Sequence, residues 1–320
     1  MANCKKISPK IYEISIENRK NKDVLKWVNV INAQKSEVDY LKRNYDFNLE
    51  HLNASISTVF SQRPIIFQEK NYFFIILHFP VYVKGKIVAA EIEFFLSHGY
   101  LVTVHNGNIP ALNNFFALCK DANNSLALYD WESSIILLSE ILNRLILDCY
   151  GLIDNTSEEI NRVEDLIFSR QQKDAVSLIL NLRRNIINLR KILQNHESIL
   201  KTLTEVKSSL VPEAEIKKHY HRLVEHSRRI WNMLDNQKEM IEVLNNTNES
   251  LLNDQMTSIM KTLTIFSVIV FPLTLLAAIF GMNAKYMPFV DHPSGFWIIL
   301  SIMFVCSIGM LIFFERKKWL

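Results

Sequence analysis

Two long apolar stretches near the C-terminus dominate the hydrophobic pattern of this chain. No charged residue occurs in 263–280 or in 293–314, whereas Lys, Glu, Asp and Asn are frequent throughout the preceding sequence. Each stretch is close to the ~20 residues that cross a ~30 Å hydrocarbon layer as a helix. Two such runs with charged flanks rarely fit into a soluble core. The pattern therefore predicts a transmembrane hairpin, with a first span at 260–281 and a second at 296–314, and roughly 260 residues in water.

The region 1–125 has the pattern of a mixed α/β domain. Segments rich in Ile, Val, Phe and Tyr alternate with turn residues such as Lys84-Gly85 and His98-Gly99. These signals predict strands at 64–68, 72–83, 86–95 and 100–105. Helical patterns cover 40–60 and 109–120.

The region 126–210 reads as long antiparallel helices. From Trp131 to Thr204 the only Gly or Pro is Gly151, so one or two long helices are expected. A stripe with alternating spacings of three and four residues, interrupted only by His196, predicts the face that packs on other helices. The stripe comprises Ile179, Leu182, Ile186, Leu189, Leu193, Leu200 and Leu203.

A single helix is predicted to join the water-soluble part to the membrane. Pro212 suits the first turn of a helix, and no further Gly or Pro occurs before Pro272. A helix of about 60 residues would be roughly 90 Å long, with a stalk at 211–259 that continues into the first span. Its stripe is mixed, so it must pack on the preceding helices and on copies of itself. The stripe alternates Ile216, Tyr220, Leu223, Ile230, Leu234, Ile241, Leu244 and Leu251 with Ser227, Gln237, Asn248 and Gln255.

The placement of charge predicts the orientation in the membrane. Lys261 lies at the start of the first span, and Arg316 to Lys318 follow the second within a basic tail, 315–320. Because basic flanks stay on the cytoplasmic side, both termini are expected in the cytoplasm and the connection 282–295 outside. The localisation predicted is the plasma or inner membrane.

Composition narrows the class further. A net charge of +3 is too weak to indicate nucleic-acid binding, and the first ten residues are polar and basic rather than a signal peptide. Cys4, Cys119, Cys149 and Cys306 are scattered, which fits free thiols in a reducing compartment. No P-loop, HExxH, GxSxG or paired catalytic carboxylates occur, so an enzyme is not expected. His219 and His226 share a helix face that His221 does not, which favours a partly exposed face over a metal site.

The first span has two unlike faces. At 100° per residue, its small, hydroxyl-bearing and a few apolar side chains fall within an arc of about 120°. The arc holds Thr257, Met260, Leu263, Thr264, Ser267, Phe271, Thr274, Ala278 and Gly281, and the aliphatic face holds Ile265, Val268, Ile269, Leu276 and Ile279. One interpretation is close helix packing through small residues. The other is a water-filled path between several subunits, with Met260, Leu263 and Phe271 as apolar constrictions that gate by dewetting.

The end of this arc resembles a known family. Gly281-Met282-Asn283 closes the span, and the context resembles that of the CorA family of divalent-cation channels. The resembling segments are 260–265, 272–274, 286–288 and 317–320, with weaker similarity at 91–105, 182–184 and 219–226. The resemblance covers about residues 70–320.

The resemblance implies a funnel-shaped homopentamer with an α+β cytosolic domain, long stalk helices and a two-helix membrane hairpin. The first span would line the pore, and Gly281, Met282 and Asn283 would form the selectivity filter at the outer mouth. Mg²⁺ dehydrates reluctantly and prefers oxygen ligands, so a ring of Asn283 carbonyls can hold the hydrated ion. Mg²⁺ would be the transported ion and also a candidate regulator, and no covalently bound cofactor is implied.

Some residues depart from the family pattern. Lys285 and Phe289 stand where Glu is common, and Asp291 is the only acid of the loop, which weakens attraction of cations. Arg222 and Asn246 stand where the family places carboxylates that bind regulatory Mg²⁺, so that sensor is predicted to be absent or moved. Glu225, Glu242, Glu249 and Asp254 remain as candidates.

The function predicted is uptake of Mg²⁺ through a membrane channel, with Co²⁺ and Ni²⁺ as further ions. A Zn²⁺ transporter of the same superfamily is an alternative that Met282 disfavours, because the zinc branch often has Ile there. A non-conducting, membrane-anchored scaffold is the alternative from another class, and Lys285 and Phe289 favour it.

Overall fold

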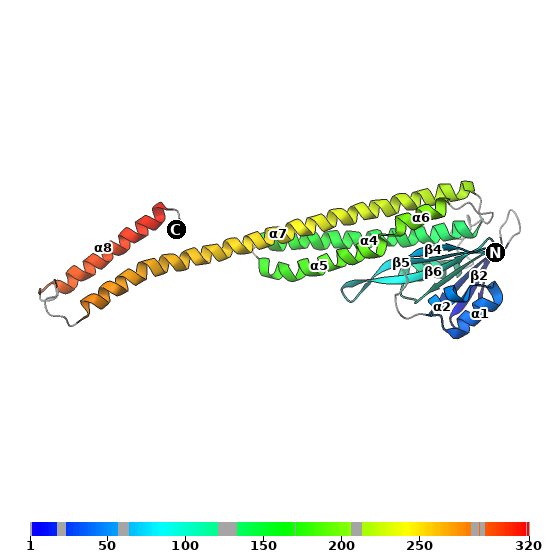
Figure 1. Cartoon of the computed structure of the whole chain (residues 1–320), viewed down its shortest axis with the longest axis horizontal. Coiled ribbons are helices and arrows are strands. Elements are labelled where there is room, and N and C mark those ends of the chain that lie inside the picture. Colours follow the sequence, from blue (N-terminus) through cyan, green and yellow to red (C-terminus); the bar gives the residue numbers. More distant parts are fainter. Residues whose placement is uncertain are drawn as a thin grey trace. The chain divides into compact units, whose positions relative to one another are not determined.

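The computed structural model describes residues 2–17, 24–56, 64–120, 133–169, 171–205, 213–282, 288, 292–317 and 319. They fall into two units, Met1–Leu244 and Asn245–Leu320. Figure 1 shows the helices and strands in order along the chain and labels most of them. The predicted boundaries near 125 and 210 lie outside the described residues.

A seven-stranded mixed sheet is the centre of the first unit. Its strands follow the order β1-β2-β3-β7-β6-β5-β4, and all neighbours are antiparallel except the parallel pair β3 and β7. The strands are β1 (Ala2–Lys6), β2 (Ile11–Glu17), β3 (Val24–Ile31), β4 (Ile65–Gln68), β5 (Phe73–Val83), β6 (Lys86–Leu96) and β7 (Tyr100–His105). The four strands expected from the sequence are confirmed as β4 to β7. β1 to β3 were not predicted.

Helices cover both faces of the sheet. One face packs against α1 (Lys35–Tyr45) and α2 (Leu49–Ala54) through a small core that includes Val38 and Leu52. The other face packs against α3 (Pro110–Lys120) and α4 (Ser134–Phe168) in a larger core. Side chains alternate between the two faces along a strand. Because helices cover both faces, both sets of residues along β5 and β6 are largely buried. The first unit thus has helices on both faces of a sheet, and the mixed α/β class predicted from the sequence is confirmed.

The helix predicted at 40–60 is wrong in its boundaries. α1 begins at Lys35 and ends where Asp46 takes a left-handed conformation with φ of 53°. Asn48 then begins α2 by accepting a hydrogen bond from the Glu50 amide at 3.0 Å. Asp and Asn tolerate these turn conformations and hydrogen-bond the backbone, so two short helices form without any Gly or Pro. Residues 57–63 lie outside the described residues.

Three helices rather than one or two occupy the next region. α4 is followed by α5 (Gln172–Leu193) and α6 (His196–Glu205). The side chain of Gln172 donates to the Ile167 carbonyl at 2.9 Å and so ties the α4–α5 turn. The predicted packing stripe on α5 and α6 is confirmed, because all seven of its apolar members are buried.

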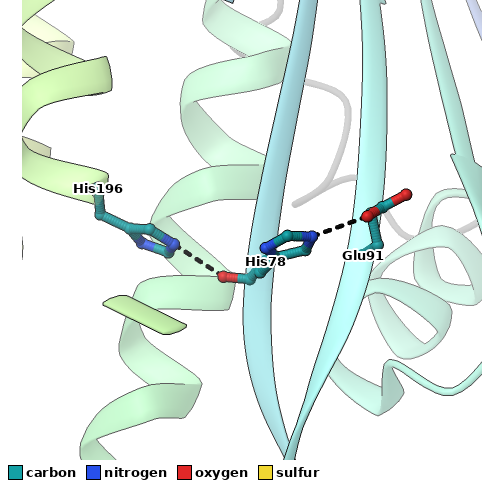
Figure 2. A network of polar contacts seen from close by, with 3 residues as sticks. All are labelled: His78, Glu91 and His196. Atoms are coloured by element: carbon teal, nitrogen blue, oxygen red, sulfur yellow. Dashed lines mark hydrogen bonds and ion pairs between the residues drawn. The ribbon is translucent and has the colours of Figure 1, made fainter. Parts of the chain in front are cut away.

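His196, which interrupts that stripe, is buried as well. Its side chain is 2% exposed, and its Nε2 donates to the His78 carbonyl on β5 at 2.8 Å, as Figure 2 shows. The His78 ring contacts Glu91 of β6 at 2.8 Å. Burial lowers the pKa of His196 to about 4, so the ring is neutral at physiological pH. The hydrogen bond to the His78 carbonyl therefore allows a polar residue, His196, to be buried at a position of the stripe where an apolar residue is expected.

α7 (Glu213–Phe280) is a single helix of 68 residues, as predicted. Within the first unit its stripe is buried from Tyr220 to Leu244, and Tyr220 donates to the Ile135 carbonyl of α4 at 3.1 Å. Gln237 donates to the Ile153 carbonyl and to the Ser157 hydroxyl, both at 2.8 Å. These two hydrogen bonds explain why a polar residue, Gln237, can be buried within the largely apolar stripe. α8 (Gly295–Arg316) completes the second unit.

Candidate functional site

The second unit contains two helices with the properties of membrane spans. α7 from its middle onward and α8 are long and apolar enough to cross a bilayer, and almost none of their apolar windows is buried within the chain. At 1.5 Å per residue the 22 residues of α8 extend roughly 33 Å, which matches a hydrocarbon layer. These helices therefore need a partner that covers apolar surface.

Aromatic side chains mark both ends of α8. Phe296 and Trp297 begin the helix with ring centroids 5.5 Å apart, and Trp319 follows its end with its ring 5.8 Å from that of Phe314. Trp is enriched where the hydrocarbon layer meets the headgroups. Arg316 and Lys317 precede Trp319 in the chain, so this end of α8 combines an aromatic ring with the basic flank.

The aliphatic face of the first span lies toward α8. Val268, Pro272 and Leu276 line one side of a shared groove, and Gly309 and Met310 of α8 line the other. Ile265 of α7 and Phe314 of α8, which also lines the groove, are both buried. The face that the sequence assigned to aliphatic packing is therefore the one that meets the second span.

The predicted pore-lining arc is left uncovered. Met260, Leu263 and Phe271 are 63%, 66% and 71% exposed. Thr257, Thr264, Thr274 and Ala278 are also exposed, and Ser267 is partly exposed. The hairpin does not use this arc for its own packing.

Each hydroxyl on the arc is bonded to its own helix. Thr264 donates to the Met260 carbonyl at 2.8 Å, and Ser267 donates to the Leu263 carbonyl at 2.9 Å. Thr257 and Thr274 make the same contact four residues back, both at 2.9 Å. Because the hydroxyl proton is used in this way, each oxygen presents only its acceptor lone pairs outward. The arc is thus a row of hydrogen-bond acceptors spaced along an apolar helix.

The predicted filter is only partly within the described residues. The Gly281 amide donates to the Ala277 carbonyl at 2.9 Å, so helical bonding continues one residue beyond α7. A Cβ on Gly281 would lie 3.1 Å from that same carbonyl oxygen, which leaves little room for a side chain. Met282 is 62% exposed. Asn283 lies outside the described residues, as do Lys285, Phe289 and Asp291.

The acidic candidates on the stalk are exposed and make local contacts. Glu225 lies 3.5 Å from His221, Glu242 lies 3.7 Å from Lys238, and Glu249 accepts from Asn245 at 2.9 Å. Asp254, Arg222 and Asn246 complete the set of stalk positions singled out from the sequence, and all three are exposed. Within the described part of one chain, no group of three or more His, Cys, Asp or Glu side chains could hold a metal ion. A regulatory metal site built on these carboxylates stays a prediction.

The three stalk histidines do not come together. His226 contacts the Tyr150 hydroxyl of α4 at 3.1 Å, whereas His221 faces Glu225 and His219 is exposed. Burial lowers the pKa of His226, and Arg222 and Arg229 add to the effect. Sequence reasoning missed another feature of the stalk, the exposed apolar side chains Met240 and Val243. Their spacing of three residues places both side chains on one face of the helix, and this spacing could have indicated the feature from the sequence.

Comparison with known proteins gives a consistent picture. Residues 22–317 match the protein family described as CorA-like Mg²⁺ transporter protein. The cobalt/magnesium transport protein CorA of Methanocaldococcus jannaschii is 22% identical over 315 residues, covering 98% of this chain and 96% of that protein. The protein of the same description from Thermotoga maritima is 24% identical over 298 residues, covering 92% of this chain and 83% of that protein.

A solved structure shows the same fold. The complete structure of the CorA magnesium transporter from Methanocaldococcus jannaschii aligns with a TM-score of 0.84 at 20% identity. The alignment covers 100% of this chain and 98% of that chain. The similarity therefore extends over the sheet, the long helices and both apolar helices.

Proposed function

Because the chain belongs to the CorA family of Mg²⁺ transporter proteins, we propose that it is a membrane channel that admits Mg²⁺ into the cell. Co²⁺ and Ni²⁺ are further ions of the proposed range, and relatives from two organisms are described as cobalt/magnesium transport proteins. The transport family also places the chain outside the enzymes. It is a membrane protein with two transmembrane helices.

The observation that carries the proposal is the uncovered row of acceptors on α7. A hydrated cation points the hydrogens of its water molecules outward, so the surrounding wall must accept hydrogen bonds. The oxygens of Thr264, Ser267 and Thr274 can do so because their protons are held by the helix backbone. A path of this kind can pass Mg²⁺ without removing its water, which the ion gives up reluctantly.

The proposed pore requires several copies of the chain. Two helices cannot enclose a path, so the arcs of several subunits must meet around an axis. We propose a homopentamer in which α7 lines the pore and α8 forms the outer ring. The exposure of Met260, Leu263 and Phe271 supports this arrangement, and rings of these side chains would serve as apolar gates.

The proposed selectivity filter is the ring of Gly281, Met282 and Asn283. Asn283 would supply side-chain carbonyl oxygens to the water shell of the ion. At Gly281 a larger side chain would crowd the Ala277 carbonyl oxygen, because a Cβ there would lie only 3.1 Å from it. In the proposed ring, a residue without a side chain would also let the backbone come close to the axis.

The proposed orientation places both termini in the cytoplasm. Lys261 lies at the start of the first span, and Arg316, Lys317 and Lys318 follow the second. A negative-inside potential then drives inward movement by about 2.3 kcal/mol per charge per 100 mV, and twice that for a divalent ion. No nucleotide hydrolysis is needed to supply this energy.

A liposome flux assay tests the function. Purified protein should carry Mg²⁺ into vesicles, and Asn283→Ala should lower the preference for Mg²⁺ over monovalent cations about tenfold, the effect of losing a hydrogen bond to a charged species. Asn44→Ala, at an exposed position of α1, is the matched control and should leave flux unchanged. If the wild-type protein carries no Mg²⁺, Co²⁺, Ni²⁺ or Zn²⁺, the channel is refuted and a scaffold role is favoured.

A further inference from the structure

A cleft in the water-soluble unit lies between the tip of the β5–β6 hairpin and helices α4 and α5. The tip is a two-residue turn in which Lys84 and Gly85 have φ of 48° and 79° and Val83 pairs with Lys86. Positive φ at both positions is the geometry of a tight hairpin turn. The hairpin therefore projects a short, well-defined edge toward the helices.

Two asparagines of α5 hold this hairpin in place. Asn185 is 5% exposed, and its Oδ1 accepts from the Ile87 amide at 3.3 Å while its Nδ2 donates to the Gly85 carbonyl at 3.4 Å. Asn188 donates to the Ile87 carbonyl at 3.0 Å. Since the tip is bonded to the helix, the cleft walls are formed before any ligand arrives.

The first lobe of the cleft is strongly basic. It has a volume of about 350 Å³ and is lined by Lys84 and Lys86 of the hairpin, Arg162 of α4 and Arg184 of α5, with Glu159 as its single carboxylate. Within the described residues none of these four cations lies within ion-pair distance of a carboxylate.

The guanidinium of Arg184 is oriented without being neutralised. Its Nη2 donates to the Asn181 Oδ1 at 3.1 Å, and Asn181 lines the same lobe. An amide partner fixes the side chain and leaves its positive charge in full. Arg presents a planar fork of donors that matches phosphate oxygens, so the lobe has the chemistry of a phosphate site.

The adjoining lobe has a different character. It measures about 490 Å³ and shares Tyr82, Glu159, Arg162 and Asn185 with the first. Its other walls combine the apolar Ile87 and Leu152 with a second carboxylate, Glu158. Tyr82, which lines both lobes, is 56% exposed. An aromatic face and apolar walls suit a base, and a carboxylate can accept from sugar hydroxyls.

We propose that the cleft binds a nucleoside triphosphate, with the phosphates in the basic lobe and the nucleoside in the adjoining lobe. Each lobe has a volume within the range of small-molecule sites. The two contrasting lobes fit a ligand with one polyanionic end and one amphipathic end. The proposal concerns binding to the water-soluble unit and does not depend on ion conduction.

Titration calorimetry with ATP on the full-length purified protein, without divalent cations, tests the proposal. ATP should bind, and Arg184→Gln and Arg162→Gln should each raise the Kd about tenfold through loss of a charged phosphate contact. Arg183→Gln is the matched control, because Arg183 is the exposed neighbour on α5 and does not line the cleft. Its Kd should stay within about twofold of the wild type.

Three results would overturn the proposal: no ATP binding to the wild type, equal weakening by Arg183→Gln and Arg184→Gln, or pyrophosphate binding as tightly as ATP. The last would leave only a phosphate site. Each variant must elute as the wild-type oligomer. If Arg184→Gln does not, the double variant Lys84→Gln/Lys86→Gln in the exposed turn carries the same expectation. Mg²⁺ flux is measured separately, so failure of transport does not decide this test.

Discussion

Among single residues, Glu93 has an unusual environment for an acid. It lies on β6 and is 3% exposed, and its carboxyl group accepts a hydrogen bond from Ser55 at the end of α2. Burial raises the pKa of Glu93 to about 8, the Ser55 bond opposes the shift, and the nearby Glu91 adds to it. A carboxyl group in this position is protonated at neutral pH.

Glu93 should therefore make stability fall as pH rises. Its folded pKa is above the ordinary value of 4.5, so the stabilisation is complete below about pH 4.5 and is lost as pH rises through about 8. Glu93→Gln should remove this decline and stabilise the protein by a few kcal/mol at pH 9, since each unit of pKa separation corresponds to about 1.4 kcal/mol.

Thermal unfolding of the detergent-solubilised protein between pH 6 and pH 9 measures this effect. Glu50→Gln, at an exposed position of α2, is the control and should keep the wild-type pH dependence. Equal slopes for the wild type and Glu93→Gln would show that the carboxyl group is not buried as described.

Such residues explain part of the gap between sequence and structure. In Glu91-Ile92-Glu93 the acids alternate with an apolar residue, which is typical of a strand with one solvent face. Helices cover both faces of this sheet, so Glu93 is buried although its pattern indicates exposure. His196 was visible as an interruption of a stripe, but its bond to the His78 carbonyl depends on contact over 118 positions.

At the scale of elements, the hydroxyls of the first span provide a test of the proposed pore. Thr264→Val keeps the size of the side chain and removes the acceptor. If the oxygen faces hydrated ions, Mg²⁺ flux in liposomes should fall about fivefold, the equivalent of one hydrogen bond of about 1 kcal/mol.

Thr262→Val is the matched control for that change. Thr262 has the same back-bonded hydroxyl, 3.0 Å from the Ser258 carbonyl, but lies on the opposite side of the helix from Thr264. Flux should be unchanged in Thr262→Val. Equal losses in both variants would mean that the hydroxyls act through helix stability rather than through a pore.

Elements with strong periodicity were predictable, and those set by weak local signals were not. The β5–β6 hairpin follows from two β-rich runs separated by Lys84-Gly85, and α7 follows from the absence of Gly and Pro between Pro212 and Pro272. β1 consists of Ala2–Lys6, which has no β-branched residue, and is defined by its pairing with β2. The breaks between α4, α5 and α6 depend on polar residues that also occur inside helices.

At the scale of the whole molecule, the sequence predicted that several copies of the chain assemble around a pore. A single chain does not show these contacts between subunits. One side of the stalk part of α7 is buried against the other helices of the first unit. Met240 and the arc of the first span are surfaces that no other part of the described chain covers, and they are where we expect other subunits to pack. Asn283, the proposed selective residue, lies outside the described residues, so the proposed filter rests on the family resemblance and on the helix that leads to it.

The proposed pentamer can be tested by mass. Native mass spectrometry from detergent micelles should give five times the 37.4 kDa of one chain. Met240→Glu places a charge on the exposed side of the stalk, where subunits are proposed to meet, and burial of an unpaired charge is costly. This variant should shift the population toward smaller species, whereas Met240→Leu should keep the wild-type mass because it preserves an apolar contact. A wild-type mass of one or two chains would refute an axial pore, since too few copies of α7 would be present to enclose one.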